Sequence, residues 1–143
     1  MIENENNSMK TVLKVENLCV DFQIRGKQVR ILSDIGFSLD RGETLGIIGE
    51  SGCGKSMTAL GLLRMIPSPP GRIRSGRVLM NGEDLTQVSE KKMRAIRGRK
   101  ISMIFQEPMT SLNPVYTIGN QISETIRCHR DRSRAEALAE AED

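Results

Sequence analysis

Tryptophan, long apolar runs and closely spaced cysteines are missing from this sequence, and each absence disfavours a class of protein. The aromatic side chains are Phe22, Phe37, Phe105 and Tyr116 alone. Binders of single-stranded nucleic acid use aromatic platforms for stacking, so that class is disfavoured. No stretch approaches the roughly 18 apolar residues that a spanning helix requires, and the acidic start lacks the pattern of a signal peptide. We therefore expect one cytosolic domain of ordinary soluble composition.

The cysteines are odd in number and widely spaced. They are Cys19, Cys53 and Cys128. Disulfide frameworks and zinc sites need paired or closely spaced cysteines, so neither is indicated and free thiols are expected.

Positive charge is concentrated in the middle of the chain, although the net charge is only +3. Residues 72–100 carry nine lysines and arginines against Glu83, Asp84 and Glu90. Because this segment has no aromatic residue, a solvated face, or docking near anionic groups, is favoured over nucleic-acid binding. The cations are Arg72, Arg74, Arg77, Lys91, Lys92, Arg94, Arg97, Arg99 and Lys100.

The first third of the chain is predicted to form antiparallel strands. Apolar residues alternate with polar ones such as Asp21 over residues 18–24, which is typical of a half-buried strand. A turn is expected at 25–28, a second strand at 31–39 and a second turn at 40–43.

The period of the apolar pattern then changes. Residues 44–49, "TLGIIG", predict a short strand buried on both faces. Residues 55–66 are apolar nearly all round, which predicts a buried helix, and the prolines in 67–70 are expected to stop it.

The second half predicts further short elements. Ser89 is a candidate helix N-cap and Gly98 a stop for the same helix. Asn81 and Gly82 predict a tight turn. The remaining expected elements are strands at 76–80 and 100–105 and helices at 118–129 and 134–143.

The stretch "GESGCGKS" at 49–56 matches the phosphate-binding pattern Gly-x-x-x-x-Gly-Lys-Ser/Thr in full. It lies between a predicted strand and a predicted helix, as this site requires. Glycines allow the backbone amides of 52–56 to converge on a polyphosphate at the positive end of the helix dipole. Lys55 is expected to reach the β- and γ-phosphates and Ser56 to offer its hydroxyl to Mg²⁺. The alternative is a mere glycine-rich turn.

Cys53 lies inside this loop, near amides that stabilise a thiolate. Its modification by a thiol reagent should therefore depend on nucleotide.

The phosphate loop alone does not choose between kinases, GTPases and transport ATPases. The stretch "ISMIFQEPMTSLNPVYTIGNQI" resembles the Q-loop region of ABC ATPases, specifically subunits that power import of oligopeptides, dipeptides and nickel. The stretches "LCVDFQ", "GFSLDRGETLGIIGESGCGKSMTALGLLRMIP" and "SGRVLMNGEDL" are similar to blocks of the same group. The resemblance covers about residues 11–143, which it marks as part of a nucleotide-binding domain after a flexible tail at 1–10.

The resemblance implies an α/β fold of the P-loop NTPase class. It consists of an antiparallel β subdomain, a P-loop strand and helix, and the start of a helical subdomain from about residue 115. The sheet of this portion is expected to be incomplete, because the family places strands absent from these 143 residues beside 44–49 and 100–105. Those two segments should then expose unpaired edges.

The same resemblance implies site residues for ATP and Mg²⁺. Gln106 matches the Q-loop glutamine, a catalytic residue that contacts Mg²⁺ and the attacking water, and Ser56 is the other metal ligand. Phe22 matches an aromatic residue that stacks on adenine, yet it also has the parity of a core residue, so both roles stay open. The cofactor-binding set is Gly49, Glu50, Ser51, Gly52, Cys53, Gly54, Lys55, Ser56, Met57 and Phe22.

The resemblance also implies partners. The loop at 107–114 and the helix from Thr117 match the part that receives the coupling helix of a membrane permease subunit. A second ATPase subunit and, indirectly, a solute-binding protein are expected, with the chain on the cytoplasmic face of the membrane. Dipeptide, oligopeptide, glutathione-like and nickel substrates all stay open.

Hydrolytic parts of the family are not found in these 143 residues. There is no "LSGGQ" signature, no strand ending in the magnesium-binding Asp with its catalytic Glu, and His129 lies in the wrong context for the switch histidine. We expect marginal folding and negligible turnover of this chain alone, well below about 1 per second. The rival hypotheses are a DNA-handling ABC ATPase, a small P-loop kinase, and a module that only docks on permease subunits.

Overall fold

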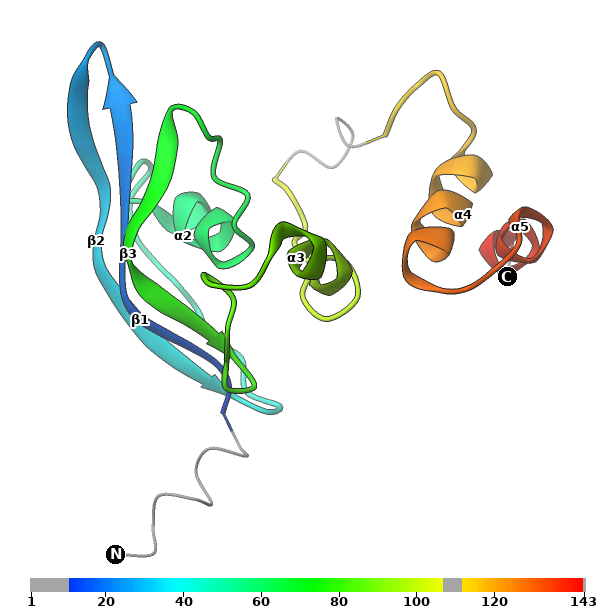
Figure 1. Ribbon diagram of the computed structural model, residues 1–143, viewed down its shortest axis with the longest axis horizontal. Helices are drawn as coiled ribbons and strands as arrows, with labels where there is room; N and C mark the ends of the chain where they lie inside the picture. The colour runs from blue at the N-terminus through cyan, green and yellow to red at the C-terminus, as the bar shows by residue number, and fades with distance from the viewer. Residues whose placement is uncertain (1–10, 107–111, 143) are drawn as a thin grey trace, which may run out of the picture. The chain divides into compact units, whose positions relative to one another are not determined.

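The computed structural model describes residues 11–106 and 112–142. These fall into two compact units, one up to Met93 and one from Arg94. The elements, drawn in Figure 1, are β1 (Thr11–Ile24), β2 (Lys27–Asp40), α2 (Lys55–Leu62), β3 (Gly71–Met80), β4 (Glu83–Asp84), α3 (Glu90–Ile96), α4 (Ile118–His129) and α5 (Arg134–Glu142). The predicted tail at 1–10 lies outside the described residues.

An antiparallel sheet with strand order β2-β1-β3-β4 forms the body of the first unit. The β1–β2 hairpin turns at Arg25 and Gly26, which have φ of 49° and 77°. A two-residue hairpin turn of this kind needs positive φ at both positions. The predicted turn is confirmed, although it is tighter than the four residues expected.

Three strands are longer than predicted, including β2, which begins at Lys27 rather than at residue 31. β1 begins at Thr11 rather than at residue 18, and β3 begins at Gly71 rather than at residue 76. The register between β1 and β2 shifts between Val15 and Leu18, and Asn17 has a φ of 50°. Such a bulge interrupts the alternation of side chains, so the first half of β1 does not show a simple period of two.

Asp21 differs from its expected place on the solvent side of a half-buried strand. Its residue is only 1% exposed. The Arg30 Nε–H and a Gln28 Nε2–H of β2 each donate a hydrogen bond to its carboxylate. The hydrogen bond from Arg30, followed by that from Gln28, lowers the pKa of Asp21 below its ordinary value. Burial of this carboxylate is thus compensated by two neighbours from the next strand.

Asp21 should make the stability of the first unit depend on pH. Because its pKa is depressed in the folded state, its contribution is complete above the ordinary Asp value of about 3.9 and is lost as the pH falls through the folded pKa. We expect Asp21→Asn to lower the free energy of unfolding at pH 7, with the difference from the unmodified chain shrinking below about pH 4. Urea titrations across this range measure it. Asp131→Asn, at an exposed position, is the control, and parallel pH curves for Asp21→Asn and the unmodified chain would contradict the prediction.

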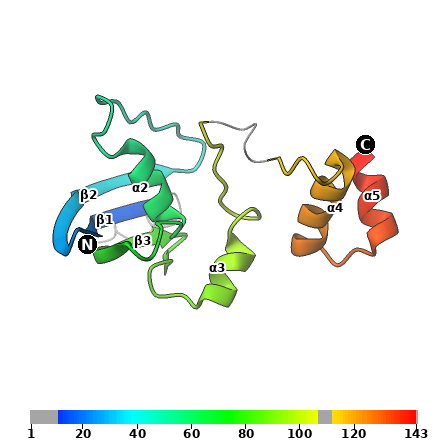
Figure 2. The same ribbon diagram turned by 90° about the horizontal axis from the view of Figure 1, so that it is seen from above.

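Helix α2 covers one face of the sheet (Figure 2). A Cβ on Gly61 would lie 3.2 Å from the Leu18 Cδ2 atom, so the helix backbone approaches β1 closely. Thr58 and Gly61 are its buried residues. The helix is therefore half-buried rather than buried all round, because its outer side is not covered within the first unit.

The end of α2 is set by hydrogen bonding rather than by proline. Arg64 has a φ of 50°. Its N–H donates to the Gly61 carbonyl over 3.1 Å, and the Met65 N–H donates to the Leu60 carbonyl over 2.8 Å. This is the Schellman pattern that closes a helix at a left-handed residue. The helix thus ends at Leu62, before the predicted proline stop.

The two predicted apolar strands at 44–49 and 100–105 are not formed. Residues 44–49 have no regular structure, and Ile48 is 97% exposed. Near 100–105 the structure has only an isolated bridge between Arg97 and Ile101, and Ile104 is 92% exposed. No strand in the described part of the chain pairs with either segment, and a strand without neighbours has no hydrogen-bonding partners. The expected incomplete sheet is confirmed.

The helices of the second half begin where predicted. The Lys92 N–H donates to Ser89 Oγ over 3.3 Å at the start of α3, and the Asn120 N–H donates to Thr117 Oγ1 over 3.3 Å at the start of α4. Gly98, with a φ of 78°, follows the end of α3. The caps thus confirm these starts and the glycine stop.

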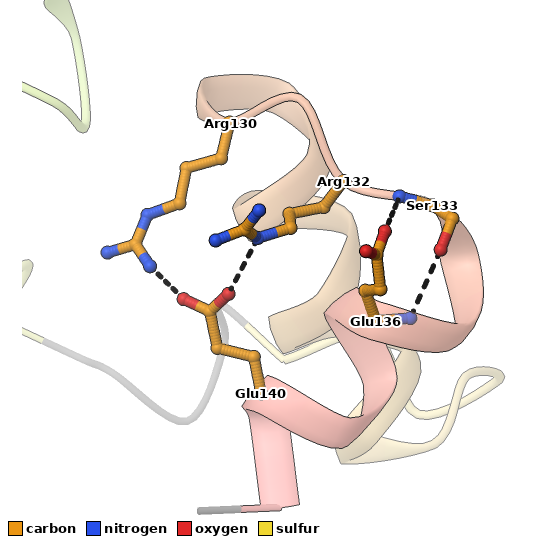
Figure 3. Close-up of polar contacts among 5 residues, drawn as sticks. All are labelled: Arg130, Arg132, Ser133, Glu136 and Glu140. Carbon is orange, nitrogen blue, oxygen red and sulfur yellow. Dashed lines mark hydrogen bonds and ion pairs between the residues drawn. The ribbon is translucent and has the colours of Figure 1, made fainter.

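In the second unit, α5 begins with a capping box, drawn in Figure 3. The Glu136 N–H donates to Ser133 Oγ over 3.3 Å, and the Ser133 N–H donates to Glu136 Oε2 over 2.8 Å. Arg130 and Arg132, between α4 and α5, both pair with Glu140. The capping box thus fixes the start of α5, and the ion pairs join the connecting segment to that helix.

Candidate nucleotide-binding loop

The glycines of the loop at 49–54 occupy positions that other residues tolerate poorly. Gly52 and Gly54 have φ of 84° and 103°, in the left-handed region. A Cβ on Gly54 would lie 2.7 Å from Leu32 Cδ2, and one on Gly49 would lie 2.6 Å from Cys53 Sγ. The loop is therefore folded tightly against β2 and against itself.

Lys55 folds back onto this loop. Its Nζ donates to the carbonyl oxygens of Gly49 and Glu50, each over 2.7 Å, and lies 3.5 Å from Cys53 Sγ. The backbone of the loop thus surrounds the Lys55 ammonium group on the side of residues 49 and 50. The ammonium can exchange these neutral carbonyl acceptors for a negatively charged one such as a phosphate oxygen, which binds it more strongly.

The loop leads directly into the N-terminus of α2. Gly54 is the N-cap, with no side-chain cap, and the first turn contains no acidic residue. Ser56 is exposed and Met57 half-buried in that turn. The positive end of the helix dipole is therefore not compensated by an acidic side chain of the helix itself, which suits an anion.

Thr58 is a supporting residue that the sequence analysis missed. It is 5% exposed, and its Oγ1 donates to the Gly54 carbonyl over 3.0 Å. This bond anchors the end of the loop to the first turn of the helix. The only signal in the sequence is a hydroxyl residue one turn after Gly54, which is too common to single out.

Phe22 lies in β1, opposite Gly71 of β3. A Cβ on Gly71 would meet the ring atoms Cε2 and Cζ at 2.7 Å, so the ring lies over that glycine. The side chain is half-buried. Packing on Gly71 accounts for the buried part of the Phe22 ring. Stacking of its exposed part on adenine stays a prediction.

Gln106 is exposed and belongs to the unit from Arg94, whereas the glycine-rich loop belongs to the other unit. Its predicted contact with Mg²⁺ and nucleotide therefore stays a prediction. The segment 107–111 of the predicted coupling loop lies outside the described residues.

The loop offers the side-chain oxygen of Ser56 as a ligand for magnesium. Among residues 11–106 and 112–142 there is no group of three or more His, Cys, Asp or Glu side chains that could hold a metal. Mg²⁺ commonly takes one or two protein ligands and completes its shell with phosphate oxygens and water. The exposed Ser56 hydroxyl fits that role. The cysteines Cys19, Cys53 and Cys128 are free, as predicted.

Comparison with known proteins agrees with this geometry. The family model for ABC transporters matches residues 32–143. The chain belongs to the ABC transporter family. The α/β arrangement with its incomplete sheet is consistent with the N-terminal portion of such an ATPase.

Several curated relatives are similar over most of the chain. The oligopeptide transport ATP-binding protein OppD of Bacillus subtilis is 45% identical over 91% of this chain and 36% of its own length. A probable peptide ABC transporter ATP-binding protein of Sinorhizobium fredii is 46% identical over 95% and 41%, respectively. The glutathione import ATP-binding protein GsiA of Salmonella typhimurium is 46% identical over 99% and 23%. The chain thus spans less than half the length of these relatives.

No helix in the described part of this family member combines the length and apolarity needed to cross a membrane.

Proposed function

We propose that this chain supplies the phosphate-binding part of the ATP-binding, energy-coupling subunit of an importer for peptides or related solutes. The observation that carries the proposal is the loop folded round Lys55 at the uncapped N-terminus of α2. Family membership and the names of the relatives support the transport role. The partial nucleotide-binding domain then covers residues 11–143.

In the proposed site, each residue contacts the phosphates, Mg²⁺ or the attacking water. The Lys55 ammonium leaves the Gly49 and Glu50 carbonyls for the β- and γ-phosphates, and the amides of 52–56 bind the same oxygens. Ser56 would hold Mg²⁺, which neutralises phosphate charge when bound. Gln106 would orient the attacking water and sense the γ-phosphate. Hydrolysis belongs to the ABC ATPase family, and turnover by these 143 residues alone is expected to be negligible because the signature and catalytic glutamate are absent from them.

Cys53 offers a direct test of nucleotide binding. Its thiol is exposed and lies 3.5 Å from the Lys55 Nζ. We expect a maleimide to modify Cys53 readily and Mg-ATP to slow this reaction several-fold, because bound phosphates cover the loop. Mass spectrometry of the labelled peptides measures the rate, with the exposed Cys128 as an internal control. Equal rates for Cys53 with and without Mg-ATP would count against the site.

An exposed apolar cluster at the start of α4 supports the proposed coupling role. Val115, Tyr116, Ile118 and Ile122 are 83%, 60%, 63% and 44% exposed within the second unit. Exposed apolar groups of this kind are typical of protein contacts. We propose that they receive a permease subunit of the importer.

Co-purification with permease subunits tests that contact. We expect Tyr116→Ala together with Ile122→Ser to weaken retention at least several-fold, while Ile104→Ser, outside this cluster, leaves it unchanged. Retention that is independent of ATP would favour the docking module over the energy-coupling subunit. Retention unaffected by the double substitution would contradict the proposed contact.

A further inference from the structure

β3 has an open edge over much of its length. One side pairs with β1 from Gly71 to Met80, with register shifts near Ser75, whereas on the other side β4 pairs only with Leu79 and Met80 within the described residues. The Leu85 N–H donates to the Val78 carbonyl over 2.7 Å, which closes the edge there. Residues 72–77 therefore form the outer edge of the sheet, away from β2, as Figure 1 shows. Their outward backbone groups are available to an added strand.

A groove of about 390 Å³ lies beside this open edge. Its volume is in the range of known ligand pockets, roughly 300 to 1,000 Å³. No carboxylate is found among its lining residues, whereas three of them are arginines. The arginines are Arg64, Arg72 and Arg74, and the other lining residues include Ile66, Thr86 and Gln87.

The two faces of β3 differ in character at this edge. Ile73 is opposite Val20, which is fully buried, so Ile73 shares the apolar face of the sheet. Arg72 is opposite Asp21, and Arg74 acts electrostatically on the same carboxylate. The alternation of side chains therefore places Arg72 on the other face. The register shifts at Arg74, but its action on the Asp21 carboxylate indicates that it lies on that face too. The alternate side chains of a strand added to β3 would lie on the apolar face and on the basic face of the sheet, respectively.

We propose that the β3 edge binds an extended acidic segment of a partner protein as an added strand, with apolar and acidic side chains alternating along it. Side chains on adjacent strands lie side by side, so the acidic residues would pair with Arg72 and Arg74 and the apolar ones would cover the half-buried Ile73. A second copy of this edge is a poor occupant, because it would place like charges against each other. The inference does not depend on nucleotide binding.

A defined peptide tests this proposal on the full 143-residue chain. The probe is a capped, fluorescent octapeptide of alternating valine and glutamate, and its binding is followed by fluorescence anisotropy. We expect saturable binding, with Arg72→Gln combined with Arg74→Gln weakening it roughly three- to tenfold. Lys27→Gln combined with Arg41→Gln, at exposed positions outside the groove, should leave the affinity unchanged. Circular dichroism confirms that both variants are folded.

Three further peptides make the test specific for strand addition. The same octapeptide N-methylated at alternate residues, in both registers, should lose binding in at least one register, because it cannot donate to the edge. A valine–lysine octapeptide should not bind. Full binding by both N-methylated peptides, or equal binding of the lysine peptide, would overturn the proposal. Displacement of the probe by millimolar inorganic phosphate at constant ionic strength would overturn it too, in favour of a small anion site.

Discussion

Replacing Lys55 with alanine should lower the affinity of the chain for Mg-ATP by roughly a hundredfold, which corresponds to about 3 kcal/mol. The Lys55 Nζ is the positive charge around which residues 49–54 fold, held over 2.7 Å by two carbonyl oxygens. Two charge-assisted hydrogen bonds to phosphate are lost in the variant, whereas the backbone amides stay. Calorimetry with a non-hydrolysable ATP analogue measures the change.

The control for Lys55 is a lysine of equal charge outside the loop. Lys27 lies in the β1–β2 hairpin, at an exposed position. Lys27→Ala should leave the affinity within about twofold. An unchanged affinity in Lys55→Ala, with the fold intact by circular dichroism, would rule out the proposed phosphate cradle.

The second large effect concerns stability rather than binding. Gly76 in β3 has a φ of 96°, and a Cβ there would lie 2.4 Å from the Asn17 carbonyl oxygen and 2.5 Å from Leu18 Cα. Both contacts are to backbone, which cannot swing aside as a flexible side chain does. We expect Gly76→Ala to cost about 2 to 5 kcal/mol, the sum of backbone strain and overpacking. Urea unfolding followed by circular dichroism measures this cost.

A substitution at Gly82 separates backbone strain from overpacking. It also has positive φ, 82°, but no atom lies within 4 Å of an added Cβ. Gly82→Ala therefore carries the strain alone, about 1 kcal/mol. If the two substitutions cost the same, the close approach of β1 and β3 at the bulge is not what requires glycine at residue 76.

Local patterns predicted the elements that depend on neighbouring residues. The hairpin at Arg25 and Gly26, the turn at Asn81 and Gly82 and the cap at Ser89 were all predicted. Each depends on a preference for positive φ or on a side chain bonding to an amide a few residues away. The glycine-rich loop was located for the same reason, since its glycines, lysine and serine all fall within residues 49–56, and its binding of phosphate stays a prediction.

Other features depend on residues far apart, and local pattern did not predict them. Asp21 is buried because Arg30 and Gln28 of the next strand satisfy it. Glycine is required at residue 76 because the Asn17 carbonyl oxygen of β1 would lie 2.4 Å from an added Cβ. Periodicity shows which side chains are apolar but not which partners will cover them.

The sequence by itself determined the family, the position of the glycine-rich loop and the order of most helices and strands, because these follow from adjacent residues. Only the tertiary structure decided where the bulge in β1 falls, which glycines are sterically required and which apolar segments lack a strand partner. Strand pairing and burial are properties of two segments together. Residues 44–49 are apolar enough for a strand, yet without a neighbour in the described part of the chain they form none.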